Sequence, residues 1–505
     1  MEGARAGRGR VSVAGFLAGS DSRCVAALGV DSFISSPTAL LDTGNFNSLI
    51  AGVYAAPKFG IGTLRVEGAE AGLLKRIAIG FIGLCVLGGL GFLALAWRSS
   101  IAPIDPPATA DFSRELIAKG EALAGAGYCA TCHTAKGGAT YAGGYGMPTP
   151  FGVIYSTNIT PDPETGIGRW SEAAFARAMH EGVARDGSHL FPAFPFYHFT
   201  KVTDEDVKAL YAYLMTRPPI RAPAQTNTVP FPLNIRLLQA GWKLLFVTNR
   251  RYQPDTTKSA EWNRGAYLAE GLSHCGACHT SRNLLGAEES SHAYAGAVVD
   301  GWIAPALTDA NPAPVPWSQA DLFSYLRSGS SALHGTAAGS MSAVVHDGLA
   351  KLPDSDIEAI ATYFADINRS ATRAAGSQES IISKAMSTSD LGIRQEPDPD
   401  ARLYVAACGS CHYNRETPLE VRPELALNTA LTLPEPTNFI RVVLDGIGIR
   451  DGMPGVIMPG FAHALGDADI ARLAAYLRRT RTELPAWTNI ESKVAAIRKE
   501  REASR

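Results

Sequence analysis

Six of the eight cysteines fall in three copies of one pattern, in which two cysteines stand three positions apart and a histidine follows the second. On one helical turn the two cysteines face the same way, and the next residue presents an imidazole beside them. CxxCH is the attachment pattern of c-type haem, so we predict three covalently bound haem c groups. The two cysteines would form the thioether bonds and the histidine would bind the iron in each copy: Cys129, Cys132 and His133; Cys275, Cys278 and His279; Cys408, Cys411 and His412.

Zinc is the main alternative for these residues, because CxxC pairs also build zinc sites. Every copy carries the adjacent histidine, no repeat contains a second CxxC pair, and the segment is expected to be exported. These features favour haem. The two remaining cysteines, Cys24 and Cys85, precede the repeats and receive no role, and a disulfide framework is not expected.

The sequence around each CxxCH copy repeats as well. Helices are expected over residues 170–182, 317–329 and 437–446, each ending at a glycine. Twelve residues after that glycine stand Phe194, Met341 and Met458. A second helix then follows, in which apolar residues one, four and eight places after an aspartate predict one buried face in all three repeats.

Met341 and Met458 are the candidates for the sixth iron ligands opposite His279 and His412. A lone methionine is usually core filler, but these two share their register across independent repeats. Met453 is the fallback in the third repeat. Ligation by a thioether and an imidazole raises the reduction potential of haem, which suits electron transfer.

The first repeat departs from this pattern, because Phe194 cannot coordinate iron. His198, four residues further on, is one candidate for the sixth ligand. Met147, Met179, His180 and His189 are weaker candidates, and the position could also be open or hold water. If imidazole replaces thioether, we expect this haem to have the lowest potential of the three. The other histidines lie outside ligand register and are expected on the surface or around the sites: His274, His292, His334, His346 and His463.

Composition limits the class of protein. The 505 residues carry 46 basic and 48 acidic side chains, and 46% of the residues are apolar. This balance fits neither a nucleic-acid binder nor a disordered chain, and the mean hydropathy near zero excludes a polytopic membrane protein. The length predicts about three domains, each with a core of its own.

Residues 77–97 are uncharged and long enough to cross a bilayer. Arg65, Lys75 and Arg76 precede this run, whereas Arg98 alone closely follows it, so we expect the N-terminus in the cytoplasm and the rest of the chain on the periplasmic side of the inner membrane. A retained signal anchor is the leading interpretation. Cleavage after the small residues of 94–96 is the alternative.

The predicted fold is all-α, with three tandem c-type cytochrome domains and one N-terminal transmembrane helix. Residues 1–73 are expected to be disordered or to lie upstream of the true start. The expected boundaries are an anchor at 74–98, domain 1 at 110–218, a linker with an amphipathic helix at 219–258, domain 2 at 259–370, a linker at 371–398, domain 3 at 399–485 and a solvated tail at 486–505.

The linker helix has an apolar face formed by Ile235, Leu238, Trp242 and Leu245. The ordinary interpretation is a helix that faces the core. The alternative is a helix that lies on the membrane or on a partner subunit, with Trp242 at the interface.

Residues 110–485 resemble the three-haem cytochrome c subunits of bacterial membrane-bound dehydrogenases. The likeness rests on residues 149–152 (TPFG), 156–162 (STNITPD), 259–267 (SAEWNRGAY) and 457–461 (IMPGF). The resemblance implies an electron-transfer subunit that takes electrons from a periplasmic catalytic subunit, with a small iron-sulfur subunit, and passes them to ubiquinone or a terminal oxidase.

Alcohol-dehydrogenase relatives generally carry methionine where this chain has Phe194, so the resemblance favours the partners of molybdenum hydroxylases that act on aldehydes or N-heterocycles. A quinoprotein alcohol dehydrogenase or a flavoprotein sugar dehydrogenase is the alternative partner. Two other functions remain open on the sequence: a haem peroxidase that uses an open first haem, and a soluble electron shuttle. No dinucleotide, phosphate-loop or nucleophile motif indicates a substrate site elsewhere in the chain.

Overall fold

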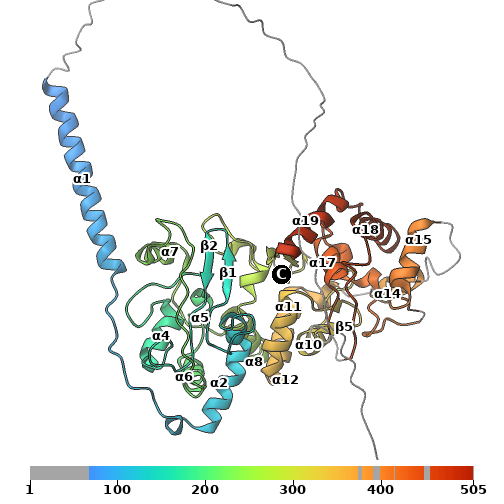
Figure 1. Ribbon diagram of the computed structural model, residues 1–505, viewed down its shortest axis with the longest axis horizontal. Coiled ribbons are helices and arrows are strands. Elements are labelled where there is room, and N and C mark those ends of the chain that lie inside the picture. The colour runs from blue at the N-terminus through green and yellow to red at the C-terminus, as the bar shows by residue number, and fades with distance from the viewer. Residues whose placement is uncertain (1–67, 374–377, 390–397, 415, 449–454, 504–505) are drawn as a thin grey trace, which may run out of the picture. The chain divides into compact units, whose positions relative to one another are not determined.

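The computed structural model describes residues 68–373, 378–389, 398–414, 416–448 and 455–503 (Figure 1). The chain forms two compact units, Met1–Ile77 and Ala78–Arg505, and all three repeats belong to the second. Of the first unit only residues 68–77 are described, as the start of helix α1 (Gly68–Ala96). The expectations for residues 1–67 and for Met453 fall outside the described residues.

Helix α1 has the composition of a membrane span. Residues Gly72–Ala96 have a mean hydropathy of 2.4 in their most apolar window, and none of that window is buried within the protein. At about 1.5 Å per residue these 25 residues are about 37 Å long, which exceeds the roughly 30 Å hydrocarbon layer of a bilayer.

Repeat 1, residues 110–218, begins with a helix capped by Ser113, whose side chain accepts from the amide of Leu116. Its last helix, capped by Thr203, packs across the first. The elements in chain order are α2 (Arg114–Ala126), α3 (Cys129–Cys132), β1 (Gly146–Thr149), β2 (Gly152–Tyr155), α4 (Glu172–Glu181), α5 (Phe196–Phe199) and α6 (Asp204–Met215). Strands β1 and β2 form an antiparallel pair.

Repeat 2, residues 259–370, has the same plan with a longer second half. Its first helix continues into a π-helical turn over Leu268–Leu272 just before the cysteines. The elements are α8 (Ala260–Tyr267), α9 (Gly276–His279), the antiparallel pair β3 (Ala297–Val299) and β4 (Trp302–Ala304), α10 (Gln319–Ser328), the pair β5 (Ser330–Ser331) and β6 (Gly335–Thr336), α11 (Ser340–Ala343), a second π-helical turn (Val344–Gly348), α12 (Asp354–Ile367) and α13 (Ser370–Arg373).

Repeat 3, residues 399–485, contains no strand within its described residues. The elements are α15 (Pro399–Tyr404), a π-helical turn (Val405–Gly409), α16 (Thr429–Thr432), α17 (Thr437–Asp445) and α18 (Asp467–Arg481). Outside the repeats lie α7 (Gln239–Phe246), α14 (Gln378–Ser389) and α19 (Ile490–Ala503). Short 3-10 turns cover Thr109–Asp111, Arg236–Leu238, Ser290–His292, Leu349–Lys351 and Leu425–Leu427.

The predicted pairs of helices are confirmed. Helices α4, α10 and α17 end at Gly182, Gly329 and Gly446, each with a positive φ. The apolar positions predicted for the second helix are nearly all fully buried in α6, α12 and α18: Val207, Leu210, Leu214, Ile357, Ile360, Phe364, Ile470, Leu473 and Leu477. The local pattern therefore determines both the helices and the faces they bury.

The expectation that each repeat buries a core of its own is wrong for the first two repeats. Leu210 of repeat 1 and Leu268 of repeat 2 belong to a single cluster of buried side chains. The close approach depends on small residues, since a Cβ added at Gly125 would lie 2.6 Å from Cβ of Lys351, and one at Gly348 would lie 2.3 Å from the Tyr128 ring. Repeat 3 has a separate core around Tyr404 and Ile440.

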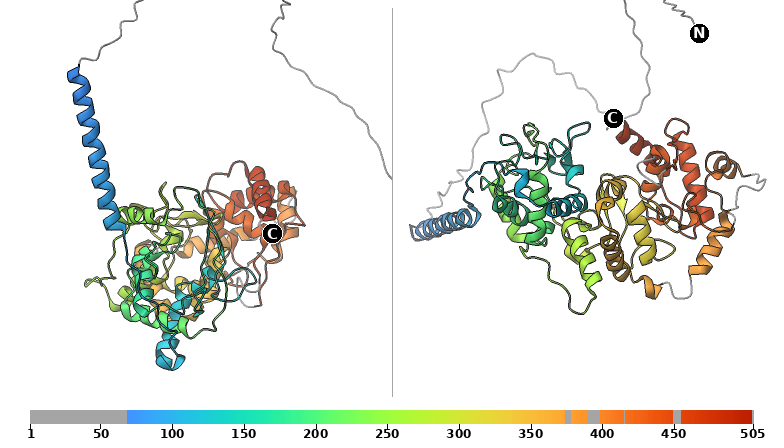
Figure 2. Two further views of the ribbon diagram at one scale, coloured as in Figure 1. Left: turned by 60° about the vertical axis from the view of Figure 1, so that its left-hand side comes forward. Right: turned by 90° about the horizontal axis from the view of Figure 1, so that it is seen from below.

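The expected linker at 371–398 contains a packed helix, and the C-terminal tail, whose pattern is helical as expected, is packed and not solvated. Helix α14 lies within the expected 371–398 linker and buries Ala385 in a small cluster that joins repeats 2 and 3. Helix α19 packs on α17 and α18, with Val494 and Ile497 buried in the core of repeat 3. Although α19 is rich in charged residues, its apolar residues recur every three to four positions and form a narrow stripe. This stripe is enough to pack one face of the helix on repeat 3. Figure 2 shows α19 against the other helices of repeat 3.

Candidate haem-binding sites

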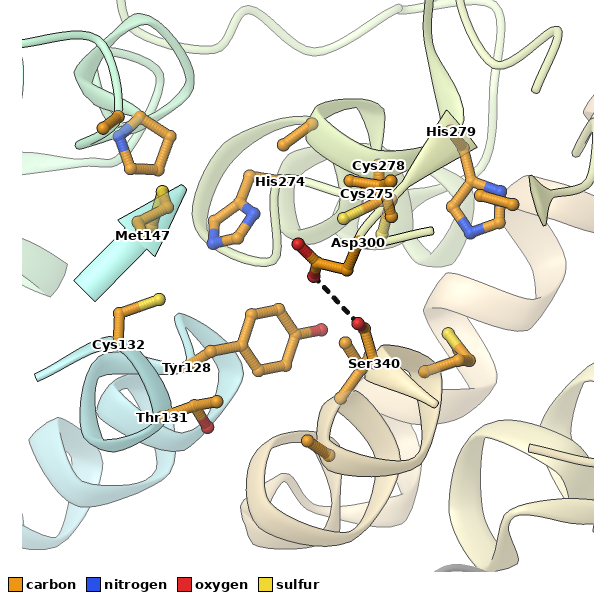
Figure 3. A pocket seen from close by; sticks show the side chains of 18 of the residues that line it. Tyr128, Thr131, Cys132, Met147, His274, Cys275, Cys278, His279, Asp300 and Ser340 are labelled. Carbon is orange, nitrogen blue, oxygen red and sulfur yellow. Dashed lines mark hydrogen bonds between the residues drawn. The ribbon is translucent and has the colours of Figure 1, made fainter. Parts of the chain in front are cut away.

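One helical turn holds each CxxCH segment in the same conformation. The amide of the histidine donates to the carbonyl of the first cysteine at 2.9 Å in repeat 1 and at 3.0 Å in repeats 2 and 3. Because this turn brings the two cysteines to one side, both sulfur atoms are available to one edge of a planar ligand. Figure 3 shows this for Cys275 and Cys278, with His279 beyond them.

The three histidines share a second feature that fits an iron ligand. Nδ1 of His133 hydrogen-bonds to the carbonyl of Thr157 at 2.6 Å, and Nδ1 of His279 to that of Pro305 at 2.7 Å. Nδ1 of His412 does the same with Pro423 at 3.1 Å. A backbone carbonyl can only accept, so Nδ1 carries the proton and Nε2 keeps its lone pair.

Burial lowers the pKa of all three imidazoles from the ordinary value of histidine, so the rings are neutral at neutral pH. A neutral ring held through Nδ1 is the usual state of a histidine that ligates a metal through Nε2. Sequence reasoning missed the three carbonyl acceptors. The spacing from histidine to acceptor, 24 residues in repeat 1 and 26 in repeat 2, is similar enough to have suggested them, but 11 in repeat 3 is not.

The first cysteines of repeats 1 and 2 are not nucleophilic thiolates. Burial raises the pKa of Cys129 and Cys275 to about 12, so neither thiol ionises at neutral pH. Within the described ranges, no three histidine, cysteine, aspartate or glutamate side chains converge as a metal-holding group. Two buried sulfur atoms on one side of a helical turn suit covalent attachment of an organic ligand.

A continuous cavity of about 1810 Å³ runs past all three histidines. Its walls include four cysteines of repeats 1 and 2 and are otherwise mostly apolar and aromatic side chains. Met341 and Met458 also line it, so the structure brings both predicted sixth ligands to the same cavity as His279 and His412. In Figure 3, Cys132 and Met147 point into the part of this cavity that belongs to repeat 1.

The backbone around each methionine is closely packed. Met458 exchanges two backbone hydrogen bonds with Ile447, at 2.8 and 3.0 Å, and a Cβ at Gly446 would lie 2.3 Å from its carbonyl oxygen. Met341 follows Gly339, where a Cβ would lie 2.3 Å from the Trp302 ring. In repeat 3 these contacts hold the backbone of Met458 against the end of α17. In repeat 2 the close contact lies two residues before Met341, between Gly339 and Trp302 of β4.

The first and second CxxCH segments meet directly. The ring of Tyr128, the residue before Cys129, packs edge to face on the ring of His274, the residue before Cys275, with centroids 5.3 Å apart. Both residues have a positive φ. Burial lowers the pKa of His274 to about 4, so it is neutral at neutral pH. His274, assigned no ligand role from the sequence, therefore lies at the contact between the two sites (Figure 3).

The structure does not bring His198 to the cavity wall. Its Nδ1 hydrogen-bonds to the carbonyl of Glu270 at 2.8 Å and its Nε2 to the Glu288 carboxylate at 2.9 Å. Both ring nitrogens thus have partners in repeat 2, and this geometry gives His198 a role in joining repeats 1 and 2. Phe194 occupies the position that corresponds to Met341 and Met458, and its side chain lines the cavity.

The weaker candidates in repeat 1 divide into two groups. His180 and His189 lie off the cavity wall, with Nε2 of each bonded to a backbone carbonyl. Met147 and Met179 do line the cavity. Met179 stands three residues before Gly182, where the other repeats have Leu326 and Val443, so its register differs from that of Met341 and Met458.

Several polar atoms on the cavity wall have no hydrogen-bond partner among the described residues. They are both ring nitrogens of His334, the side-chain oxygen of Asn368 and the hydroxyl of Thr429. His334 is buried and stacks on Trp317 at 3.7 Å, and its Nε2 lies 3.8 Å from the nearest Asp321 oxygen, too far for a hydrogen bond. An apolar cavity with a few unpartnered polar groups fits a porphyrin, which is apolar except for its two carboxylates.

Comparison with known proteins agrees with this geometry. Residues 117–218 match the family described as cytochrome c, and residues 395–477 match the family described as cytochrome c oxidase, cbb3-type, subunit III. The fructose dehydrogenase cytochrome subunit of Gluconobacter japonicus is 37% identical over 405 residues, which cover 76% of this chain and 83% of that protein. The chain belongs to the family of dehydrogenase cytochrome c subunits.

Further members of the family show the same relation. The gluconate 2-dehydrogenase cytochrome c subunit of Pantoea cypripedii is 36% identical over 82% of this chain and 94% of its own length. A nicotinate dehydrogenase subunit of Pseudomonas putida is 47% identical over 81% of this chain, but the chain spans only 34% of that protein. The predicted all-α cytochrome fold, the covalent attachment of haem c and the role in electron transfer rather than catalysis are confirmed.

Proposed function

We propose that this chain carries three haem c groups, one in each repeat, and conducts electrons away from a dehydrogenase catalytic subunit. The support for three haems is a hydrogen bond from the histidine Nδ1 to a backbone carbonyl, which recurs at His133, His279 and His412. Haem c supplies one-electron redox chemistry when bound. The protein's part is to attach, orient and shield the groups.

Each repeat would hold its haem through two cysteines and one histidine. In repeats 2 and 3, Met341 and Met458, which line the same cavity as the histidines, would also hold the haem, and the apolar walls would exclude water. We propose that the position equivalent to Met341 and Met458 supplies no ligand in repeat 1, because Phe194 stands there; Met147, which lines the cavity, is a thioether that repeat 1 still offers. His198 would serve there only after giving up its hydrogen bonds to Glu270 and Glu288.

We propose a molybdenum hydroxylase that acts on N-heterocycles or aldehydes as the catalytic partner, together with a small iron-sulfur subunit. The support is the 47% identity to a protein named for nicotinate, an N-heterocyclic acid. A flavoprotein sugar dehydrogenase or a quinoprotein alcohol dehydrogenase is the alternative, supported by the relatives named for fructose, gluconate and alcohol. Helix α1 would anchor the chain on the periplasmic side of the inner membrane, with ubiquinone or a terminal oxidase as acceptor.

The haem count tests the core of this proposal. The chain, matured with haem and purified from membranes, should contain three covalent haems by haemochrome assay and intact mass. Replacing both cysteines of one repeat with alanine, for example Cys408→Ala with Cys411→Ala, should remove one haem and leave two. Cys85→Ser is the matched control and should keep all three. A wild-type protein with two haems, or a repeat whose cysteine variants change nothing, would refute the assignment.

Two further measurements separate electron transfer from peroxidase activity. The reduced protein should be oxidised by a quinone or by the membrane fraction and should reduce again when the co-purified dehydrogenase receives its substrate. Steady peroxide turnover at a rate above that of free haem, together with carbon monoxide binding to one haem, would favour the enzyme instead.

A further inference from the structure

A group of large apolar side chains around α7 is exposed to solvent. Six of them define what we call the α7 surface: Phe231 (79% exposed), Leu238 (42%), Leu244 (66%), Leu245 (70%), Leu284 (97%) and Leu285 (56%), of which Leu238 and Leu285 also line the haem cavity. They come from two segments that Trp242 joins, since its indole N–H donates to the carbonyl of Leu285 at 2.9 Å. Exposed apolar surface gathered in this way marks a site of interaction with another apolar partner.

The last turns of α1 lie against the same segment. A Cβ added at Gly241 of α7 would lie 3.5 Å from the ring of Phe92, so the backbone of α7 and the Phe92 ring are in contact. Ala96, the last residue of α1, is fully buried, and its carbonyl hydrogen-bonds to Nε2 of His189 at 2.8 Å. Figure 1 and the left view of Figure 2 both show α7 beside this end of α1.

His189 links the end of α1 to the α7 segment. Its backbone carbonyl accepts from Arg236 at 3.1 Å, and its Nδ1 lies 3.0 Å from Nζ of Lys243. Lys243 also donates to the carbonyls of Glu181 and Gly182, both at 2.6 Å. Hydrogen bonds to repeat 1 therefore fix the position of α7 along the axis of α1, in addition to the contact between α7 and the Phe92 ring.

Phe92 lies inside the apolar span, four residues or about 6 Å before its end. A helix in contact with Phe92 must lie at the depth where the span leaves the bilayer. We infer that the α7 surface lies in the interfacial layer of the membrane that α1 enters, as a second, peripheral attachment of repeat 1 to lipid. The inference rests on the proposed anchoring by α1.

The chemistry of the segment suits this layer. An interfacial helix presents leucine, phenylalanine and tryptophan to lipid and keeps basic side chains at its margin. Leu244 and Leu245 supply the apolar face, and Trp97, 74% exposed, stands directly after α1. Arg98 and Arg250 are exposed near the ends of α1 and α7 and can meet the phosphate groups of lipids. A protein partner would have to enter between α7 and the bilayer to cover the same surface.

Membrane attachment at α7 would also fix where repeat 1 sits. Leu238 and Trp242 contribute to the wall of the haem cavity as well as to the α7 segment. The repeat 1 site would therefore be held next to the lipid surface.

Lipid photolabelling of the haem-loaded full chain tests the inference. The protein is placed in vesicles of phosphatidylethanolamine and phosphatidylglycerol that contain a phospholipid with a diazirine near its headgroup, and labelled sites are mapped by mass spectrometry. We expect labels in α1, at 231–245 and at 284–285. Leu419 and Val421 of repeat 3, 43% and 47% exposed, are exposed leucine and valine side chains away from α1 and should stay unlabelled.

A double variant, Leu244→Gln with Leu245→Gln, should lose the labels in α7 and keep those in α1, with an unchanged haem spectrum as the test of folding. Labels in α1 but none in the α7 surface would overturn this inference and leave the anchoring intact. No labels in α1 would overturn the anchoring itself. Protection of the α7 surface by a co-purified dehydrogenase subunit would identify a protein as its occupant and would also overturn the inference.

Discussion

The crossing of α8 and α12 in repeat 2 predicts that Gly265→Ala strongly destabilises the protein. A Cβ at this position would lie 1.9 Å from the carbonyl oxygen of Ala359 and 2.9 Å from Cβ of Tyr363. Ordinary contact begins near 3.4 Å, so the two helices would have to separate by roughly 1.5 Å. The obstructing atom belongs to the backbone and cannot rotate away.

Overpacking of this kind costs about 1–3 kcal/mol, and a backbone obstacle places the cost at the upper end. Alanine recovers up to about 1 kcal/mol through its higher helix propensity. The free energy of unfolding should fall by about 2 kcal/mol in total. For the unit formed by repeats 1 and 2, this lowers the melting temperature by roughly 4–8 °C. Gly271→Ala is the matched control, because its nearest neighbour, Cβ of Lys201, would lie at 3.6 Å.

Thermal unfolding of the haem-loaded protein, followed by circular dichroism and by haem absorbance, measures the difference between the two variants. The haem spectrum near neutral pH should remain that of the wild type, because the substitution lies outside the cavity. If Gly265→Ala melts within one degree of Gly271→Ala, the helices do not cross as closely as described, and the reasoning fails.

Three further predictions concern other parts of the chain. Met341→Ala and Met458→Ala should each lower the potential of one haem in a redox titration and remove one methionine-to-iron charge-transfer band, while Met179→Leu should change neither. Burial and the nearby Arg251 lower the pKa of His180 to about 4, from about 6.5 in the unfolded chain. The unfolded state therefore binds the proton first, and up to about 3 kcal/mol of stability should be lost as the pH falls from 6.5 to 4. Urea unfolding at several pH values should show this decrease in the free energy of unfolding. His180→Gln should make the decrease smaller. Asp206→Asn should lower the free energy of unfolding in urea by about 1–2 kcal/mol. The reason is that Asp206 is buried, pairs with Lys119 at 2.6 Å and accepts from the Tyr267 hydroxyl at 2.6 Å. Asp204→Asn, at an exposed carboxylate, should lower it less.

The helices and their termini could be predicted from the sequence because their causes are local. The glycine at the end of α4, α10 or α17 adopts a positive φ, and the apolar spacing of α6, α12 and α18 marks the face that is buried. The same holds for CxxCH, where chemistry and spacing together define one helical turn. Repetition then made the register of Met341 and Met458 visible.

Contacts between distant segments could not be predicted in this way. The tail at 486–505 looked solvated, yet Val494 and Ile497 are buried, because α17 and α18 present an apolar groove that only the folded repeat creates. His198 stood close in sequence to the expected ligand position. Its hydrogen bonds to Glu270 and Glu288 depend on how repeat 2 packs on repeat 1.

The amino-acid sequence by itself determined where the three CxxCH turns lie, and that Met341 and Met458 occupy the same position in two of the repeats. Tertiary structure alone decided which carbonyl holds each imidazole, that repeats 1 and 2 share one core, and that Tyr128 meets His274. The physical reason is the distance along the chain over which each feature is determined. Covalent attachment of haem needs the residues of one helical turn. Burial and hydrogen bonding between distant segments depend on surfaces that exist only once the helices have packed.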